Sequence, residues 1–165
     1  MIPNLIIYYS LSGHTRAAAE IIQQVTGGAL ASIRTRDEYP PEGPELHEQG
    51  RKEVTTGFLP ALNDFPADLA AYDVVFLGCP VWWHSMAPAM KSFLAAHSLA
   101  GKTVIPFVTC EGGGGHALTD LSAAAEGAAV KSGLVIRFSE GRSVLRQELV
   151  VNWARNALKS LEESE

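Results

Sequence analysis

Five short apolar runs alternate along the chain with segments in which apolar residues recur at helical spacing. The runs cover residues 5–9, 29–33, 73–77, 102–109 and 134–138. Helical spacing occurs at positions 18, 21, 22 and 25, at 86, 89, 90, 93 and 94, within 117–126, and at 150, 153, 154, 157, 158 and 161. Short apolar runs are typical of buried strands, so this alternation predicts an open parallel sheet with helices on both faces.

The composition of the runs predicts their order in the sheet. Residues 5–9, 74–77 and 104–108 are almost wholly apolar and suit central strands, whereas Ser32 and Arg137 place the second and fifth runs at the edges. This predicts the strand order 2-1-3-4-5, in which ligands bind at the carboxyl ends of the first and third strands. The segments that follow those two strands, residues 10–15 and 78–85, are therefore the candidate binding loops.

Residues 34–71 break the alternation, with five prolines and eight acidic residues among them. We expect a long connection with one helix between residues 44 and 56. Connections of this length are often functional, but a solvated acidic face over a poorly formed helix explains the pattern equally well. The pattern therefore assigns no chemistry here. Further along, Ser85 is the expected cap of the next helix, with Pro88 in its first turn.

Composition excludes several classes of protein. The 165 residues, 47% of them hydrophobic, fit one domain over 1–165, and the net charge of -5 argues against a nucleic-acid binder. No apolar run approaches a membrane span, and no charged leader precedes the first strand, so we expect a cytoplasmic protein with no membrane or nucleic-acid partner. The two cysteines are expected to be reduced thiols, and no metal site is predicted.

The first candidate loop, residues 10–15, suits an anion. Ser10, Ser12 and Thr15 offer hydroxyls, Gly13 permits a tight turn, and the following helix presents free N–H groups at the positive end of its dipole. A phosphate group is the expected ligand of this loop. Two other phosphate motifs are excluded, because residue 96 is alanine where a P-loop needs glycine and residue 118 is leucine where a dinucleotide motif needs glycine.

The second candidate loop contains two adjacent tryptophans, Trp82 and Trp83. Neighbouring side chains on an extended chain point opposite ways, so at least one indole is expected to face something other than the interior. A flat aromatic ligand, a partner protein and plain surface packing are all open at this point.

Three segments together resemble the flavodoxin family, and the resemblance extends over essentially the whole chain. Ser10-Leu11-Ser12-Gly13-His14-Thr15 resembles that family's phosphate loop, and Gly78-Cys79-Pro80-Val81-Trp82-Trp83 resembles the Gly-x-Pro-x-Trp-Trp loop of one branch. Residues 101–107, with Thr109 and the glycines at 112–115, resemble the third flavin loop. The resemblance implies a flavodoxin-like three-layer α/β sandwich, with a five-stranded parallel sheet and FMN as its cofactor.

The resemblance also implies which residues hold FMN. The first loop would bind the phosphate, and the second and third loops would enclose the isoalloxazine ring, where an indole offers a flat stacking face. No side chain is implied as catalytic, because the flavin carries out the electron chemistry. The implied cofactor-binding residues are Ser10, Ser12, Gly13, His14, Thr15, Pro80, Val81, Trp82, Trp83, His84, Thr109, Glu111, Gly112 and Gly113.

Two residues depart from the family pattern. The related branch commonly has glycine where this chain has His84, whose imidazole either faces water or places an ionisable group near the ring. Glu111 opens the third loop where small polar residues are more usual. A carboxylate near the ring would oppose an anionic reduced flavin and lower its potential.

Three functions are compatible with these features. The first is FMN-dependent electron transfer to a redox partner protein. The second is NAD(P)H-dependent reduction of small acceptors such as a quinone, because residues 34–71 could wall a pocket over the ring and no dense acidic cluster surrounds residues 78–85. The third is a non-redox scaffold that binds proteins. An FMN-dependent oxidoreductase or electron carrier is favoured, and whether the chain is an enzyme stays open.

Overall fold

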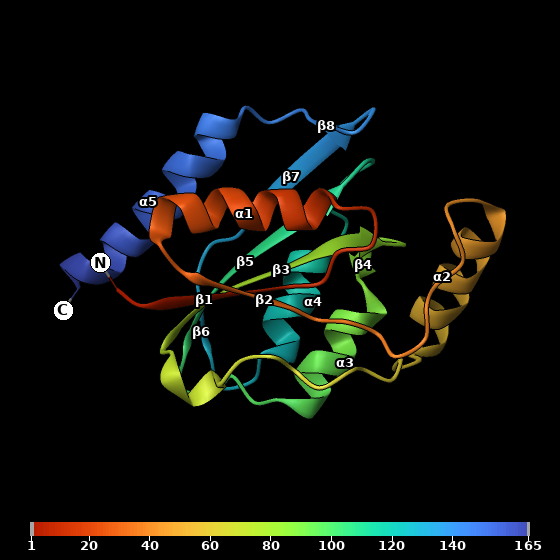
Figure 1. The fold of residues 1–165 in the computed structure, drawn as a ribbon, viewed down its shortest axis with the longest axis horizontal. Coiled ribbons are helices and arrows are strands. Elements are labelled where there is room, and N and C mark those ends of the chain that lie inside the picture. Colours follow the sequence, from red (N-terminus) through yellow and green to blue (C-terminus); the bar gives the residue numbers. More distant parts are fainter. Residues whose placement is uncertain (1, 165) are drawn as a thin grey trace.

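A parallel sheet runs through the centre of the computed structural model, which describes residues 2–164 (Figure 1). Its main strands follow the order β2-β1-β3-β5-β7, so the predicted order 2-1-3-4-5 is confirmed. These strands are β1 (Asn4–Tyr8), β2 (Ala29–Ser32), β3 (Val74–Trp82), β5 (Thr103–Cys110) and β7 (Leu134–Ser139). Three short strands join them: β4 (Ser85–Met86), β6 (Ala129–Val130) and β8 (Arg142–Ser143).

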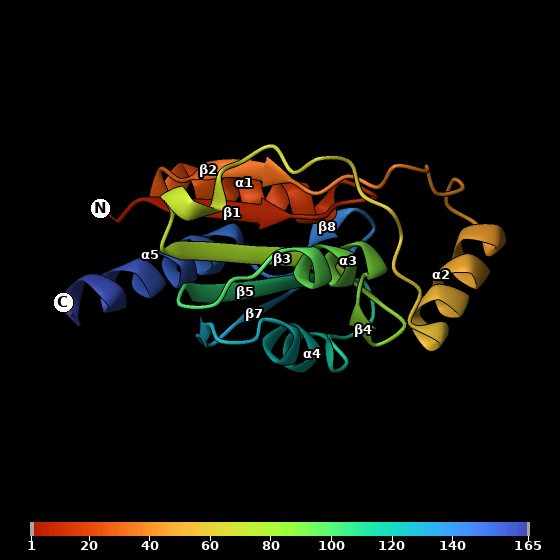
Figure 2. The ribbon, with the colours of Figure 1, turned by 90° about the horizontal axis from the view of Figure 1, so that it is seen from below.

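Helices cover both faces of the sheet, as predicted (Figure 2). On one face α1 (His14–Thr26) and α5 (Gln147–Glu163) bury their apolar stripes against the strands. On the other face lie α3 (Pro88–Ala96), α4 (Ala117–Ala124) and a short 3-10 turn (Leu69–Ala71). The helix α2 (Pro44–Thr56) stands beyond the carboxyl ends of the central strands (Figures 1 and 2). Among residues 2–164, no helix is both long enough and apolar enough to cross a bilayer.

The third strand is longer than the predicted run at 73–77. It continues to Trp82 because residues 78–80 pair with β5, and Val81 and Trp82 pair with β4 in an antiparallel hairpin. Ser85 is therefore a strand residue, and the prediction that it caps the next helix is wrong. Ala87 holds that N-cap position, and Pro88 lies in the first turn as expected. Most of the segment predicted as a loop is thus strand.

Candidate functional site

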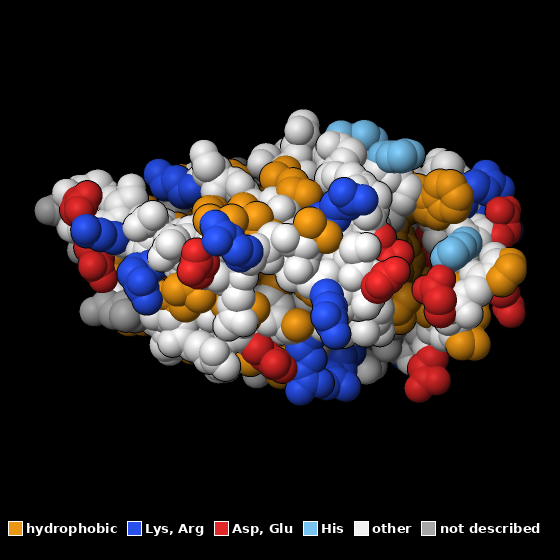
Figure 3. Space-filling model, turned by 90° about the horizontal axis from the view of Figure 1, so that it is seen from above, with side chains coloured by type: hydrophobic (Ala, Val, Ile, Leu, Met, Phe, Trp, Pro, Cys, Tyr) orange, Lys and Arg blue, Asp and Glu red, His pale blue; other side chains and the backbone are white. Residues whose placement is uncertain are grey.

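A cavity of about 460 Å³ opens at the carboxyl ends of the central strands, within the range that small-molecule sites occupy. Four segments enclose it: the β1–α1 loop, the β3–β4 hairpin, the loop after β5, and α2 with the residues before it. Figure 3 shows this side of the molecule hollowed between α2 and the body of the sheet, with acidic side chains on both sides of the hollow. The segments that the sequence analysis expected to hold a ligand therefore meet at one place.

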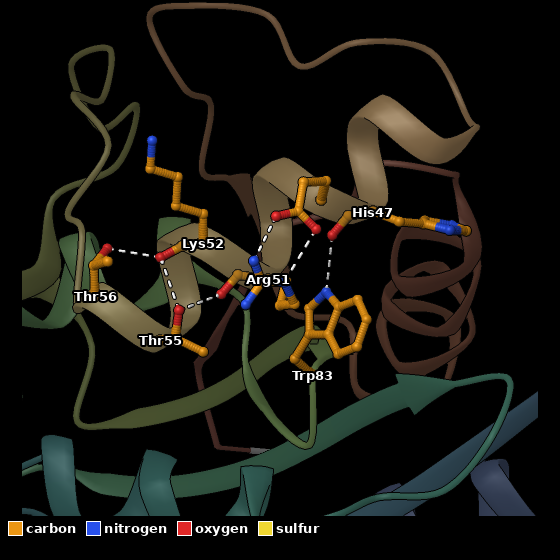
Figure 4. A network of polar contacts seen from close by, with 7 residues as sticks. His47, Arg51, Lys52, Thr55, Thr56 and Trp83 are labelled. Atoms are coloured by element: carbon orange, nitrogen blue, oxygen red, sulfur yellow. Dashed lines mark hydrogen bonds and ion pairs between the residues drawn. The ribbon is translucent and has the colours of Figure 1, made fainter.

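The β3–β4 hairpin presents the two tryptophans to different surroundings. Trp82 is half-buried and meets Tyr9 and Tyr39 edge-on, with ring centroids 6.3 Å and 5.1 Å away. Trp83 is 46% exposed, and its indole Nε1–H donates to the backbone oxygen of His47 in α2 at 3.1 Å (Figure 4). Trp82 is thus anchored in the fold, while Trp83 joins the hairpin to α2.

The tip of the hairpin explains why glycine suits position 84. Trp83 and His84 have φ of 48° and 70°, so both lie in the left-handed region that a two-residue hairpin turn requires. A residue with a Cβ is disfavoured there, whereas glycine is not. The side chain of His84 is exposed and lines the cavity.

Replacing His84 with glycine is therefore expected to stabilise the fold by about 0.5–1 kcal/mol, because the left-handed strain outweighs the entropy that glycine gains in the unfolded chain. Urea denaturation followed by tryptophan fluorescence measures the change. The matched control is His84→Ala, which also removes the imidazole but keeps the strained backbone. A gain of equal size in both variants would contradict the explanation.

The loop after β5 is joined to the hairpin tip at the backbone. His116 N–H donates to the His84 carbonyl oxygen at 2.7 Å, and a Cβ added to Gly115 would lie 2.4 Å from that oxygen. The carboxylate of Asp120 accepts from the Ser85 hydroxyl at 2.5 Å and lies 2.5 Å from His116 Nδ1. These contacts hold two walls of the cavity together as one unit.

Open space lies next to Gly112 and Gly113, the two glycines of the loop after β5 that line the cavity. A Cβ added to Gly112 or Gly113 would meet no atom within 4 Å, so their backbone is accessible to a ligand. Glu111 is exposed beside them, and its backbone oxygen accepts from Arg137 Nε at 3.0 Å. The loop after β5, which is the third of the implied flavin loops, thus offers free backbone groups with a carboxylate alongside.

The first candidate loop, residues 10–15, connects β1 to α1 and includes the first two residues of α1. Gly13 is its N-cap with φ of 99°, and the Ser10 hydroxyl accepts from the N–H groups of Gly13 and Arg16, both at 3.2 Å. Within the described chain, no protein group accepts from the N–H of His14 or Thr15. Free N–H groups at a helix start, together with the dipole, suit an anion.

Two side chains of the first loop contact residues of neighbouring strands. The ring of His14 stacks on Phe138 at a centroid distance of 4.3 Å and an angle of 5° between the planes. The hydroxyl oxygens of Thr15 and Thr109 are 2.7 Å apart in the buried interior. The Thr15 side chain therefore links α1 to β5 and does not face the cavity.

A buried carboxylate fastens α2 near Trp82. Glu53 accepts from the Tyr39 hydroxyl at 2.6 Å and from the Gln49 side-chain amide at 2.9 Å. Burial raises the pKa of both Tyr9 and Tyr39 above the ordinary value for tyrosine, and the Glu53 charge raises each of them further. Both phenols therefore keep their protons beyond the pH at which an exposed tyrosine ionises.

The raised tyrosine pKa values predict a loss of stability in alkali. Above about pH 10 the unfolded chain releases tyrosine protons that the folded chain retains, so the free energy of unfolding falls as the pH rises. For Tyr9 the slope is at most about 1.4 kcal/mol per pH unit. Urea denaturation at neutral pH and at about pH 11 should show a smaller loss in Tyr9→Phe than in the unaltered protein. Equal losses in both proteins would contradict this assignment.

Both cysteines are free thiols, as expected. Cys79 is buried, and burial raises its pKa to about 12. Cys110 lines the cavity, and burial raises its pKa as well. Strand register pairs Cys79 with Val108, so Cys110 lies two residues beyond the position opposite Cys79. Both thiols therefore stay protonated and unpaired near neutral pH.

Most of the residues implied for the cofactor line the cavity. Three of them, Ser10, Gly13 and Thr15, do not line it. The sequence analysis allowed that residues 34–71 could wall a pocket but named no lining residue there, although a glycine at position 50 inside a helix pattern is a signal of close approach. The residues that line the cavity without having been implied are Leu11, Glu42, Leu46, His47, Gly50 and Cys110.

Solved structures of flavoproteins share this fold. A protein from Bacteroides eggerthii, assigned as a flavoprotein, aligns with a TM-score of 0.76 at 28% identity and covers 92% of this chain and 94% of its own. A second one, from Bacteroides uniformis, has a TM-score of 0.78 at 24% identity and covers 92% and 97%. A flavoprotein from Lactobacillus acidophilus in complex with FMN has a TM-score of 0.69 at 22% identity and covers 82% and 93%.

The sequence itself matches the flavodoxin family over residues 3–157. That range includes the whole sheet and every segment that lines the cavity. Fold and sequence therefore agree, and the chain belongs to the flavodoxin family.

Proposed function

We propose that this protein binds FMN in the cavity and transfers electrons through it. The observation that carries the proposal is the meeting of three complementary surfaces at one cavity: a helix start with free N–H groups, a tryptophan hairpin and a glycine loop. A ligand with one phosphate and one flat aromatic ring matches those surfaces. Membership of the flavodoxin family and the likeness to the FMN complex from Lactobacillus acidophilus support the choice of FMN.

The residues present fit the cofactor. Ser12 and the free N–H group of His14 would hold the phosphate, where helix dipole and hydrogen bonds act together. The ring would lie between the hairpin and the backbone of Gly112 and Gly113. When bound, FMN supplies the electron chemistry, and the protein binds it, orients it and sets its potential.

Reconstitution tests the proposal directly. Protein mixed with FMN is expected to retain the yellow chromophore through gel filtration and to quench its fluorescence, since an adjacent indole is an effective stacking partner. Failure to retain FMN would overturn the proposal. Retention of FMN would instead count against a purely protein-binding scaffold, which needs no flavin.

Reduction of small acceptors is a second candidate, favoured by the position of α2. Residues Glu42, Leu46, His47 and Gly50 close the cavity on the side away from the sheet, which leaves a bounded space for a small molecule. A carrier that serves only partner proteins has no need of such a wall. Steady-state oxidation of NADH or NADPH, with and without a quinone, separates the two functions. No turnover with any donor would leave electron transfer between proteins as the function.

A further inference from the structure

The wall formed by α2 belongs to none of the three segments proposed to hold FMN. Leu46, His47 and Gly50 come from the helix itself, and Glu42 comes from the residues just before it. We call these four residues the α2 wall. They lie across the cavity from the first and third loops and next to the tryptophan hairpin, so part of the cavity is bounded by residues that the cofactor alone does not require.

Several contacts hold the α2 wall in place. The Trp83 indole donates to the backbone oxygen of His47 at 3.1 Å (Figure 4). Gly50 faces both indoles, because a Cβ there would lie 3.4 Å from Trp82 Cε3 and 3.6 Å from Trp83 Nε1. The buried Glu53–Tyr39 hydrogen bond fastens the same helix one turn further on. The wall is therefore a fixed part of the site.

The carboxylates and cations around the cavity are unevenly distributed, and its lining is acidic. Two carboxylates, Glu42 and Glu111, lie among its lining residues, and no lysine or arginine does so within the described chain. The remaining titratable lining groups are three imidazoles and the Cys110 thiol, and His47 Nε2 lies 2.6 Å from the Glu42 carboxylate. Three nearby arginines have partners of their own: Arg51 pairs with Glu48, Arg16 pairs with Glu20, and Arg137 donates to the backbone oxygen of Glu111.

We propose that the α2 wall, together with Glu111 of the loop after β5, selects the small-molecule electron acceptor by charge and favours planar acceptors that are uncharged or cationic over anionic ones. The inference rests on the proposed function, because it concerns a second ligand in a cavity that already holds FMN. Leu46, Gly50 and the exposed Trp83 supply an apolar surface for a flat molecule. Glu42 and Glu111 repel a negative charge placed between them.

Equilibrium binding of two matched quinones tests the selection without turnover. FMN-loaded, oxidised protein is titrated at low salt with 2-methyl-1,4-naphthoquinone and with 1,4-naphthoquinone-2-sulfonate, and the flavin absorbance change gives each Kd. Both titrations are made at about pH 8. The sulfonate is expected to bind about tenfold more weakly than the methyl compound.

Removing the two carboxylates should remove the selection. The double variant Glu42→Gln, Glu111→Gln is expected to lower the ratio of the two Kd values to about threefold or less, and salt at about 0.5 M should lower it in the unaltered protein. The control is Glu45→Gln, which removes an exposed carboxylate of the same helix that does not line the cavity. Its ratio is expected to match that of the unaltered protein.

The failure of this inference is distinguishable from the failure of the proposed function. A protein that retains no FMN contradicts the proposed function. A protein that retains FMN but binds both quinones equally, or binds neither, contradicts only the selection by the α2 wall. A ratio that stays at about tenfold in the double variant would also overturn it, because the selecting charges would then lie elsewhere.

Discussion

Replacing Gly115 with alanine is expected to destabilise the fold by about 2–4 kcal/mol and to weaken FMN binding about 10- to 100-fold. Its φ is +52°, and an added Cβ would lie 2.4 Å, 2.6 Å and 2.8 Å from the oxygen, Cα and carbonyl carbon of His84. Backbone atoms cannot turn aside as the end of a flexible side chain can, so the hairpin or the third loop must shift. Both line the cavity, and a shift of either moves a surface that the flavin needs.

Gly101→Ala is the matched control for this prediction. Gly101 has φ of +81°, but a Cβ there would meet no atom within 4 Å. The variant Gly101→Ala should therefore destabilise the fold only through left-handed backbone strain, by about 1–2 kcal/mol, and leave the affinity for FMN unchanged. Urea denaturation and fluorescence titration with FMN measure the two effects. Equal losses of affinity in both variants would show that strain, and not contact with His84, is responsible.

The sheet could be predicted because its strands are buried on both faces. Every residue of β1 is buried, and after Asn4 the strand appears in the sequence as an uninterrupted apolar run, while the helices that cover it show helical spacing. The strand order followed from the same principle, because Ser32 and Arg137 lie in strands that flank the central three. Wherever burial alone determines the structure, a pattern of apolar residues is enough to predict it.

The hairpin at the end of β3 could not be predicted in this way. Residues 78–82 include a glycine and a proline, both of which are rare in strands, so they had the appearance of a loop. They are extended because residues 78–80 pair with β5 and residues 81–82 pair with β4. The pairing with β4 depends on a turn in which Trp83 and His84 adopt a left-handed backbone conformation. The sequence at these two positions does not predict a left-handed conformation, because neither residue is glycine.

The position of α2 against the cavity also could not be predicted from the local sequence pattern. Its bounds agree with the predicted helix at 44–56, because Pro44 starts it and Gly57 ends it in left-handed conformation. Its position against the cavity depends on contacts between residues far apart in sequence, such as the bond from Trp83 to His47. Acidic composition indicated a solvated face, and the side of the helix that meets the indoles is marked in the sequence only by Gly50.

Gly78→Ala is expected to cost about 3 kcal/mol or more, because it overpacks the centre of the sheet. Gly78 pairs with Phe107 across β3 and β5, and a Cβ there would lie 2.1 Å, 2.2 Å and 2.6 Å from three atoms of the Phe107 ring. That ring is fully buried, and Trp153 packs against it edge-on at 6.4 Å, so it has little room to move.

Phe107→Leu provides the test of this explanation, because a smaller side chain leaves space for the new methyl group. Alone it should cost about 1–2 kcal/mol through lost burial, yet combined with Gly78→Ala it should restore at least about 1 kcal/mol relative to the sum of the two single changes. Urea denaturation of the four proteins in the cycle gives this coupling energy. If the two costs simply add, the ring is not what requires glycine at position 78. If they couple as expected, the first residue of the Gly-x-Pro-x-Trp-Trp segment serves the packing of the sheet, and the flavin-binding role belongs to the residues that follow it.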